Sequence, residues 1–360
     1  MYRNIIIGVL ITACTGVFCV TAASGFQDVL DTPAHKSPIV GKHLYNGIAL
    51  AGKRLVAVGQ YGYILYSDDQ GKSWNQANVP VSCDLLAVHF PTPEKGWAVG
   101  HDGIVLHTSD AGVNWIKQLD GREAPKIMSD YYAQNLPKGL SEDDLDRFKS
   151  DIQQFVDEGA DKPFLCVFFE NETTGFIGGA FNMIFRTGDG GKSWEPWFDR
   201  VDNPGLLHQY SINFIDGDIY MTGEQGMVWK LDRQAMRFKN VRTPYDGTLF
   251  GITGNKGTII AFGMRGNVYR STDKATNWTK IETGLPMGIT GGTVNEDGRI
   301  LLVSQAGNVL AGKGDNSGFF MVPGPIFPSA AIASPERNTV VLAGFAGLLP
   351  QKLTLKEAGE

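Results

Sequence analysis

The stretch Ser67-Asp68-Asp69-Gln70-Gly71-Lys72-Ser73-Trp74 follows the pattern Ser/Thr-x-Asp-x-Gly-x-x-Trp, and the pattern returns at residues 108–115 and 187–194. In such a stretch the hydroxyl and the carboxylate can accept hydrogen bonds from turn amides, and the glycine can take a positive φ. The tryptophan can fold back over the turn. Each copy therefore predicts a tight hairpin between two strands.

We interpret this motif, the Asp-box, as structural, because its spacing gives each aspartate a task in the turn rather than in catalysis. A fourth copy at residues 271–278 has Ala275 where the glycine belongs, so we expect it to keep its strands while relaxing the turn. The structural Asp-box residues are Ser67, Asp69, Gly71, Trp74, Thr108, Asp110, Gly112, Trp115, Thr187, Asp189, Gly191, Trp194, Ser271, Asp273 and Trp278.

A second repeat runs through the chain and continues beyond the last Asp-box. It consists of an apolar strand ending in Gly or Ser, two loop residues, a Gly or Asn, and another apolar strand, as in Trp97-Ala98-Val99-Gly100-His101-Asp102-Gly103. Seven copies are anchored at residues 59, 100, 179, 223, 263, 304 and 344, and all intervals but the second are close to 40 residues. This period is typical of a propeller blade. The sequence thus predicts an all-β fold: one seven-bladed β-propeller over residues 24–360, with a helical insertion between blades 2 and 3.

The innermost strand of each blade should lie just before its anchor. The predicted inner strands are 44–49, 85–90, 164–169, 211–214, 249–253, 289–294 and 330–333. Blade 7 runs out of chain near Leu353, so we expect the stretch around Ile39 and Val40 to add its missing outer strand and cover an exposed edge. Residues 28–37 would then wrap the outside.

Composition agrees with many short strands and excludes some partners. The chain has 45 glycines and 20 phenylalanines among 360 residues, and only 19% of residues are charged. A net charge of -6 and the lack of a basic run with interleaved aromatic residues argue against nucleic acid and against an anionic membrane surface as ligands.

The first residues predict export. Arg3 precedes an apolar run at residues 5–20 and small residues at 21–24, which indicates a secretory signal over residues 1–23, cleaved after Ala22 or Ala23. The protein is then periplasmic. Lipoprotein processing at Cys14 is the alternative, and the apolar run is short for a retained membrane anchor.

Two cysteines, Cys83 and Cys166, remain after removal of the signal. They could form a disulfide in an oxidising compartment, and two separate buried thiols are the alternative.

The long interval contains an insertion at about residues 117–163, the only helical segment that the sequence predicts. Ser141 with the following Glu-Asp-Asp indicates a helix start, and Leu145, Phe148, Ile152 and Phe155 recur at helical spacing. Acidic residues outnumber basic ones here. Either the helix packs on the rim through its apolar face, or the insertion is a lid or a partner-docking arm.

Propeller connectivity sorts the loops into two faces. The Asp-box turns share one face, and the turns after the anchors share the other with the links between blades. The second face collects polar and large apolar tips that are typical of a recognition surface. The candidate binding residues there are Tyr61, His101, Asp102, Phe181, Glu224, Arg265 and Phe345.

The sequence does not indicate an enzyme. A sialidase needs an arginine cluster and a Tyr/Glu pair over the channel, but the predicted inner strands contain no arginine and no carboxylate. His89 lies in one of them, and we interpret it as structural. No cofactor and no metal ligand set is predicted. The alternative is a glycan-binding or glycan-hydrolysing propeller that uses loop carboxylates such as Asp102 and Glu224.

The seven repeats, the early Asp-boxes, the Gly100-His101-Asp102-Gly103 turn and the export signal together resemble the photosystem II assembly and stability factor family. This resemblance implies a non-catalytic seven-bladed propeller that binds membrane-protein subunits during assembly. Photosynthetic members are described as using an arginine-rich patch, for which Arg186, Arg265 and Arg270 are the candidates here. The acidic insertion departs from the compact family core.

We therefore expect an exported, non-catalytic scaffold with an integral membrane protein or an envelope complex as its partner. In relatives from bacteria that do not photosynthesise, the resemblance implies an accessory to an inner-membrane transporter or another envelope complex.

Overall fold

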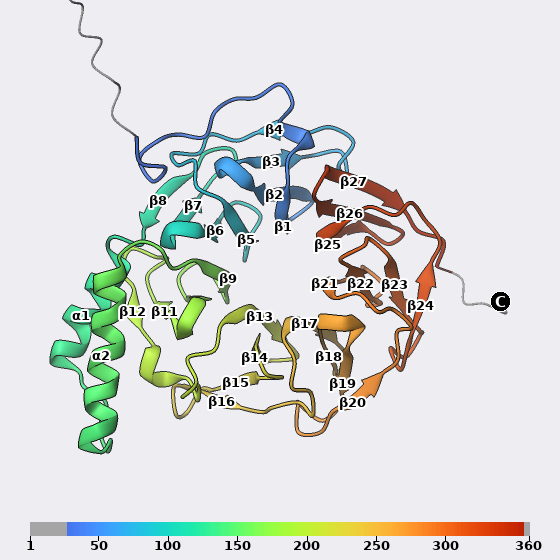
Figure 1. The fold of residues 1–360 in the computed structure, drawn as a ribbon. Coiled ribbons are helices and arrows are strands. Elements are labelled where there is room, and N and C mark those ends of the chain that lie inside the picture. Colours follow the sequence, from blue (N-terminus) through green and yellow to red (C-terminus); the bar gives the residue numbers. More distant parts are fainter. Residues whose placement is uncertain (1–26, 356–360) are drawn as a thin grey trace, which may run out of the picture.

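The computed structural model describes residues 27–355 and contains seven antiparallel sheets arranged in a ring (Figure 1). The predicted all-β, seven-bladed propeller is confirmed. The predicted signal sequence and Cys14 lie outside the described residues. No helix within residues 27–355 is long and apolar enough to cross a membrane.

Six blades have four strands each and the seventh has three. Blade 1 consists of β1 (Tyr45–Ala51), β2 (Arg54–Gly59), β3 (Ile64–Ser67) and β4 (Asn75–Gln76), and blade 2 of β5 (Leu85–His89), β6 (Gly96–Gly100), β7 (Val105–Thr108) and β8 (Ile116–Leu119). Blade 3 consists of β9 (Phe164–Phe169), β10 (Gly175–Gly179), β11 (Ile184–Thr187) and β12 (Glu195–Pro196), and blade 4 of β13 (Gln209–Ile215), β14 (Asp218–Gly223), β15 (Val228–Asp232) and β16 (Arg237–Asn240).

The remaining blades follow the same order. Blade 5 consists of β17 (Leu249–Asn255), β18 (Thr258–Gly263), β19 (Val268–Ser271) and β20 (Thr279–Ile281), and blade 6 of β21 (Ile289–Val294), β22 (Ile300–Ser304), β23 (Val309–Gly312) and β24 (Phe319–Val322). Blade 7 consists of β25 (Ser329–Glu336), β26 (Thr339–Gly344) and β27 (Gly347–Lys352).

All seven predicted anchors end the second strand of a blade, and most are glycine for a steric reason. At this position the carbonyl that precedes the inner strand comes very close. A Cβ added to Gly59 would lie 2.1 Å from the Leu44 carbonyl oxygen, and one added to Gly263 would lie 2.0 Å from that of Thr248. The same carbonyl accepts the next amide, as when Met264 N–H donates to Thr248 O at 3.0 Å. Glycine therefore lets the turn and the inner strand bond to each other.

The ring closes through inner strands, and the predicted closure by an outer strand is wrong. Each innermost strand contacts the next one, and β25 contacts β1. Val40–Lys42, expected to extend blade 7, forms the 3-10 helix η1 and packs against β27 without joining its sheet. The edge of β27 instead contains Pro350, which has no N–H to offer to another strand.

The Asp-boxes form the predicted hydrogen bonds. In the first copy the Gly71 amide donates to Ser67 Oγ at 2.9 Å, and the Ser67 hydroxyl and the Ser73 amide both donate to Asp69 Oδ1 at 2.8 Å. The Trp74 indole N–H donates to the Gly71 carbonyl at 3.0 Å. The second and third copies repeat the hydroxyl and carboxylate bonds.

The fourth Asp-box corrects our expectation, because its turn is not relaxed. The Ala275 amide donates to Ser271 Oγ at 3.0 Å, and the Asn277 amide donates to Asp273 Oδ1 at 2.8 Å, as in the other copies. Ala275 takes φ = 69°, in the left-handed region where glycine is normally favoured. The side-chain hydrogen bonds are thus sufficient to hold the turn without its glycine.

The insertion begins later than predicted and contains two helices rather than one. Residues 116–119 belong to β8, so the insertion starts after Leu119. Helix α2 (Glu142–Glu158) begins as expected, with the Asp144 amide donating to Ser141 Oγ at 3.2 Å. Helix α1 (Ala124–Gln134) was not predicted, although Pro125 in its first turn is a helix-start signal.

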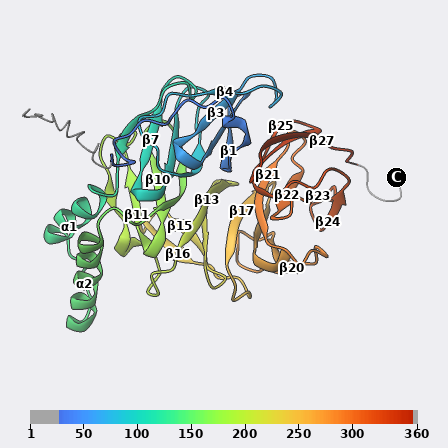
Figure 2. The same ribbon diagram turned by 45° about the horizontal axis from the view of Figure 1, so that its top comes forward.

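Both helices lie outside the ring beside blade 3 (Figures 1 and 2). Helix α1 contacts β12, and the Tyr132 hydroxyl donates to Asp199 Oδ1 at 2.7 Å. Met128, Tyr132 and Phe155 are buried in one cluster with residues of blades 2 and 3. Packing on the rim is therefore confirmed, and the alternative of a lid over the middle of the ring does not agree with this position.

Cys83 and Cys166 are both free and buried, so the structure contains no disulfide between them. Cys83 packs in a cluster of blades 1 and 2, and Cys166 in a cluster of blades 3 and 4. Burial raises the pKa of each thiol to about 12. The alternative of two separate buried thiols is the one that the structure contains.

The contact at the anchors generates a first prediction. Gly263→Ala should lower the free energy of unfolding by about 2–3 kcal/mol, because the new methyl group overlaps the Thr248 carbonyl. Gly41→Ala is the matched control, because a Cβ there has no neighbour within 4 Å. Denaturant unfolding compares the two variants. Equal stability of both variants would contradict the steric role of the anchor.

The Asp-box carboxylates generate a second prediction, on acid stability. The Ser73 hydroxyl and amide lower the pKa of Asp69 to about 2, and the backbone and side-chain amides of Asn277 lower that of Asp273 to about 2. Both values lie below the unfolded value of about 3.9. Their stabilising effect is therefore present above pH 4 and is lost as the pH falls towards 2.

The measurement is the slope of unfolding free energy against pH between 4 and 2. The double variant Asp69→Asn/Asp273→Asn should have a shallower slope than the unmodified protein. Asp130→Asn, an exposed position on α1, is the control and should leave the slope unchanged. A double variant with the unmodified slope would show that these carboxylates do not stabilise the turns.

Candidate functional site

The seven turns that follow the anchors lie on one face of the ring, which we call the anchor face. The Asp-box turns lie on the opposite face. In five of the anchor-face turns the second loop residue takes a left-handed backbone conformation although it is not glycine. These residues are Tyr61 (φ 57°), Asp102 (54°), Phe181 (52°), Gln225 (51°) and Arg265 (56°). This conformation costs about 1–2 kcal/mol per residue other than glycine. The side chains at these tips therefore lower the free energy of unfolding.

Most of the predicted binding residues are accessible on the anchor face. The side chains of Tyr61, Phe181 and Phe345 have exposed fractions of 54%, 46% and 69%. His101 and Arg265 are also exposed, whereas Asp102 and Glu224 are half-buried. The anchor face therefore presents large apolar groups that the propeller does not use for its own packing.

An aromatic row, made of Phe181, His208, Tyr210 and Phe250, crosses from blade 3 to blade 5. The ring centroids of Phe181 and His208 are 4.7 Å apart, those of His208 and Tyr210 6.2 Å, and those of Tyr210 and Phe250 5.9 Å. Tyr210 and Phe250 lie near the starts of inner strands β13 and β17, at the anchor face. The row is half-buried apart from Phe181, so it offers ring edges to a ligand.

Of the aromatic row, only Phe181 was predicted from the sequence. A usable signal was present, because residues 208 and 210 are two apart at the start of a strand and so lie on one side of it. A second group lies at blade 1, where the rings of His43, Tyr61 and Tyr63 have centroids 5.0–5.9 Å apart. Of this group, only Tyr61 was predicted.

The two candidate carboxylates, Asp102 and Glu224, lie in different blades and have different surroundings. Asp102 lies in blade 2, where burial raises its pKa. Glu224 lies in blade 4, where Oε2 accepts the His208 amide at 3.0 Å. Blade 3 separates them, and each has its own neighbours. His89 is structural, as expected: its Nδ1 accepts the Phe169 amide at 3.2 Å, and burial lowers its pKa to about 4.

The three candidate arginines do not form one patch. The Arg186 guanidinium lies over the Trp197 ring at 5.8 Å, within blade 3. Arg270 lies in β19, the third strand of blade 5, and Arg265 alone lies in an anchor-face turn. Within the described residues, no group of three or more His, Cys, Asp or Glu side chains is placed to hold a metal ion.

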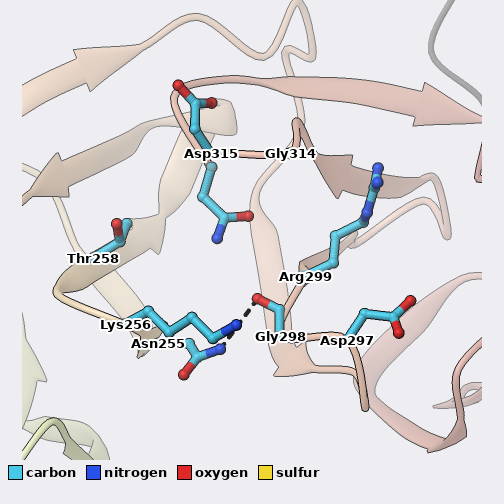
Figure 3. A pocket seen from close by; sticks show the side chains of 9 residues that line it. Asn255, Lys256, Thr258, Asp297, Gly298, Arg299, Gly314 and Asp315 are labelled. Atoms are coloured by element: carbon cyan, nitrogen blue, oxygen red, sulfur yellow. Dashed lines mark hydrogen bonds between the residues drawn. The ribbon is translucent and has the colours of Figure 1, made fainter.

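A polar hollow of about 270 Å³ lies on the Asp-box face between the first hairpin turns of blades 5 and 6 (Figure 3). Its polar groups bond to the surrounding chain. Asn255 Nδ2 donates to the Gly298 carbonyl at 3.3 Å, and Arg299 donates to the Gly312 carbonyl at 3.1 Å. The Asn255 bond therefore joins blades 5 and 6, whereas the Arg299 bond lies within blade 6.

Comparison with known proteins gives the family. A family model described as "Photosynthesis system II assembly factor YCF48" matches residues 51–125 and 146–314, which is more than half of the chain. The chain belongs to this family. The gap between the two matched ranges, residues 126–145, falls in the insertion and covers most of α1 and the start of α2.

Individual relatives agree with this assignment. The chain is 20% identical over 294 residues to the "Photosystem II assembly lipoprotein Ycf48" of Synechococcus sp. strain CC9902, covering 77% of this chain and 72% of the relative. Two solved structures have the same fold. One is described as "YCF48 bound to D1 peptide" (16% identity, TM-score 0.61, covering 87% of this chain and 94% of that one). The other is YCF48 from Cyanidioschyzon merolae (12% identity, TM-score 0.60, covering 88% and 97%).

The strained tips generate a third prediction. Arg265→Gly should raise the free energy of unfolding by about 0.5–1 kcal/mol, because glycine adopts positive φ without the steric cost of a side chain. Thr279→Gly, at an exposed position of strand β20, is the control and should lower stability by a similar amount. Both are measured by denaturant unfolding. Destabilisation by Arg265→Gly would show that the arginine side chain contributes to folding.

Proposed function

We propose that this chain is a non-catalytic, exported assembly factor that binds a segment of an integral membrane protein on its anchor face. The observation that carries the proposal is the set of exposed and half-exposed aromatic side chains on that face, above all Phe181 and the aromatic row. Aromatic groups at accessible positions are enriched where proteins bind other proteins.

The relatives support the kind of partner. One is named for the assembly of photosystem II, and one solved structure is described as bound to a D1 peptide. By analogy, we propose that the client of this chain is a subunit of a membrane complex. The complex is either photosynthetic or part of the bacterial envelope, and a transporter is one candidate.

We further propose that residues 1–23 act as an export signal and that residues 24–360 form the mature propeller on the periplasmic side of the membrane. The relative named a lipoprotein supports attachment through Cys14 as the alternative. Both routes would keep the propeller close to a membrane, where a subunit under assembly is accessible.

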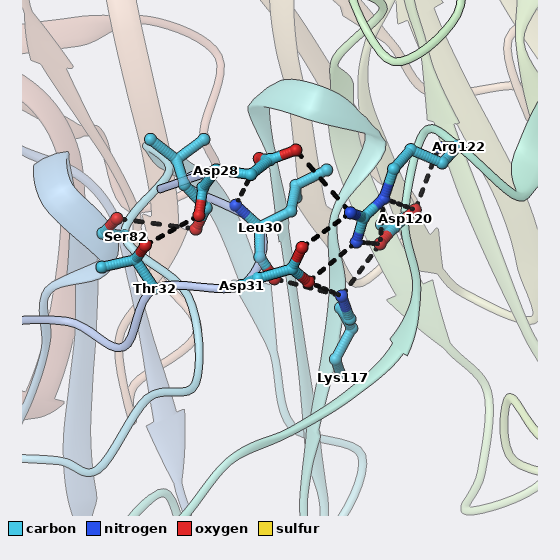
Figure 4. Close-up of polar contacts among 9 residues, drawn as sticks. Asp28, Leu30, Asp31, Thr32, Ser82, Lys117, Asp120 and Arg122 are labelled. Carbon is cyan, nitrogen blue, oxygen red and sulfur yellow. Dashed lines mark hydrogen bonds and ion pairs between the residues drawn. The ribbon is translucent and has the colours of Figure 1, made fainter. Parts of the chain in front are cut away.

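The position of the N-terminal segment agrees with this orientation (Figure 4). Arg122 bonds to Asp31 at 2.8 Å and to Asp120 at 2.6 Å, and Lys117 bonds to Asp120 at 2.9 Å. These ion pairs fix the segment against blade 2. The Ser82 amide donates to the Val29 carbonyl at 2.9 Å, so the segment starts beside the link between blades 1 and 2, which lies on the anchor face. An N-terminal membrane attachment would therefore bring the anchor face towards the membrane.

The test is an affinity pull-down of the tagged, exported protein from solubilised native membranes. The unmodified protein should retain a stoichiometric integral membrane protein. Tyr61→Ser/Phe181→Ser should reduce its recovery about tenfold or more, because the variant removes accessible aromatic anchors. Met321→Ser, which alters a 52% exposed side chain on outer strand β24, is the control and should retain the partner.

Two results would contradict the proposal. One is recovery of the same membrane protein with both variants, which would move the binding site away from the anchor face. The other is recovery of no protein together with binding or cleavage of a glycan, which would favour a carbohydrate ligand.

A further inference from the structure

A continuous groove runs between helix α2 and the link that joins blades 3 and 4. Its wide part has a volume of about 550 Å³ and is lined by Arg147 on the helix and Pro204 on the link, which a hydrogen bond joins across it. Its narrow end has a volume of about 80 Å³ and reaches the Phe181 turn. Asp151 and Leu206 line both parts, so the groove leads from the insertion to the anchor face.

The narrow end combines apolar walls with two carboxylates, of which Glu158 is paired with Lys162. Phe155, Phe181 and Leu206 line it together with Asp151. Phe155 is buried, while Phe181 keeps almost half of its surface exposed. A volume of about 80 Å³ is well below the several hundred Å³ of a typical small-molecule site. The narrow end therefore suits one inserted side chain rather than a cofactor or a metabolite.

Asp151 is the carboxylate of the narrow end that the protein itself leaves unpaired, because Glu158 pairs with Lys162. Lys162, the cation of the narrow end, is 2.5 Å from Glu158. Arg147 is one helical turn from Asp151, but its guanidinium donates to the Pro204 carbonyl at 3.1 Å. Within the described residues Asp151 accepts no hydrogen bond and forms no ion pair, although it is half-buried. Burial raises its pKa, and the charge of Arg147 offsets this effect only in part.

We propose that the groove receives an extended basic segment of the protein partner and that its narrow end binds a lysine or arginine side chain of that segment. The proposal rests on the proposed function. The cation would pair with the Asp151 carboxylate, and the aliphatic stem would pack against Phe155 and Leu206. Phe181 would contribute its ring face, as it already does to Lys162, whose amino group is 5.3 Å from the ring centroid.

Charge complementarity favours a basic segment as the occupant of the groove. The insertion contains more acidic than basic residues. Of its basic groups at the groove, Arg147 and Lys162 already have partners in the protein, whereas Lys138 lines only the wide part. An acidic segment would face uncompensated repulsion at Asp151, and a purely apolar one would bury that carboxylate without a partner. A basic side chain alone satisfies both the walls and the charge.

The test uses random dodecapeptides displayed on phage and selected on the tagged, exported protein. Selected peptides should be enriched in lysine or arginine beside an apolar residue. Fluorescence anisotropy then gives the dissociation constant of a labelled selected peptide. Asp151→Asn should weaken binding about tenfold, and binding to the unmodified protein should weaken with added salt. Asp151→Lys should restore binding to the peptide whose basic residue is changed to glutamate.

The matched control is Asp157→Asn, which alters an exposed carboxylate on the same helix, bonded only to Gln153. It should leave the dissociation constant unchanged. Selected peptides without basic residues, or equal binding by Asp151→Asn and the unmodified protein, would overturn the groove assignment. The proposed function would then still be tested by the pull-down. The loss of the membrane protein that we expect with the Tyr61→Ser/Phe181→Ser variant does not depend on Asp151.

Discussion

The structure depends on one close contact, repeated around the ring, between an anchor residue and the carbonyl that precedes the inner strand. The absence of a side chain at most anchors lets the second strand come near enough to bond with that carbonyl. This bond forms in six of the seven blades and fixes where the turn begins, and the strand order places all seven turns on one face. The surface that we propose for binding is therefore a consequence of backbone packing, and the side chains at its tips can differ between turns without changing the fold.

Stability and function divide between the two faces. On the Asp-box face, hydroxyls and carboxylates bond to turn amides, which lowers the pKa of Asp69 and Asp273 and leaves few groups for a ligand. On the anchor face, five residues other than glycine hold strained backbone conformations, and several expose aromatic or charged side chains. Strain that the fold does not need is typical of a functional surface. The insertion adds a helix beside that surface at Phe181, and thereby extends it.

The sequence predicted the structure correctly where a local backbone geometry requires one type of residue. The glycine anchors reflect a steric limit and the Asp-box residues a fixed set of turn bonds, so both could be read without coordinates. The closure of blade 7 could not be predicted from the sequence. Helix η1 packs against β27 through tertiary contacts, and such contacts leave no periodic pattern in the sequence. The turn at Ala275 is kept because the hydrogen bonds that Ser271 and Asp273 accept from its amides outweigh the cost of positive φ. The aromatic row joins residues from separate blades, and only the ring brings them together.

The most direct test of the central claim is photo-crosslinking in native membranes. A photoreactive amino acid would replace Phe345 on the anchor face or, in a second variant, the exposed Lys72 on the Asp-box face. The account predicts a covalent adduct with an integral membrane protein from position 345 and none from position 72. An adduct from position 72 alone, or equal adducts from both positions, would contradict the assignment of binding to the anchor face.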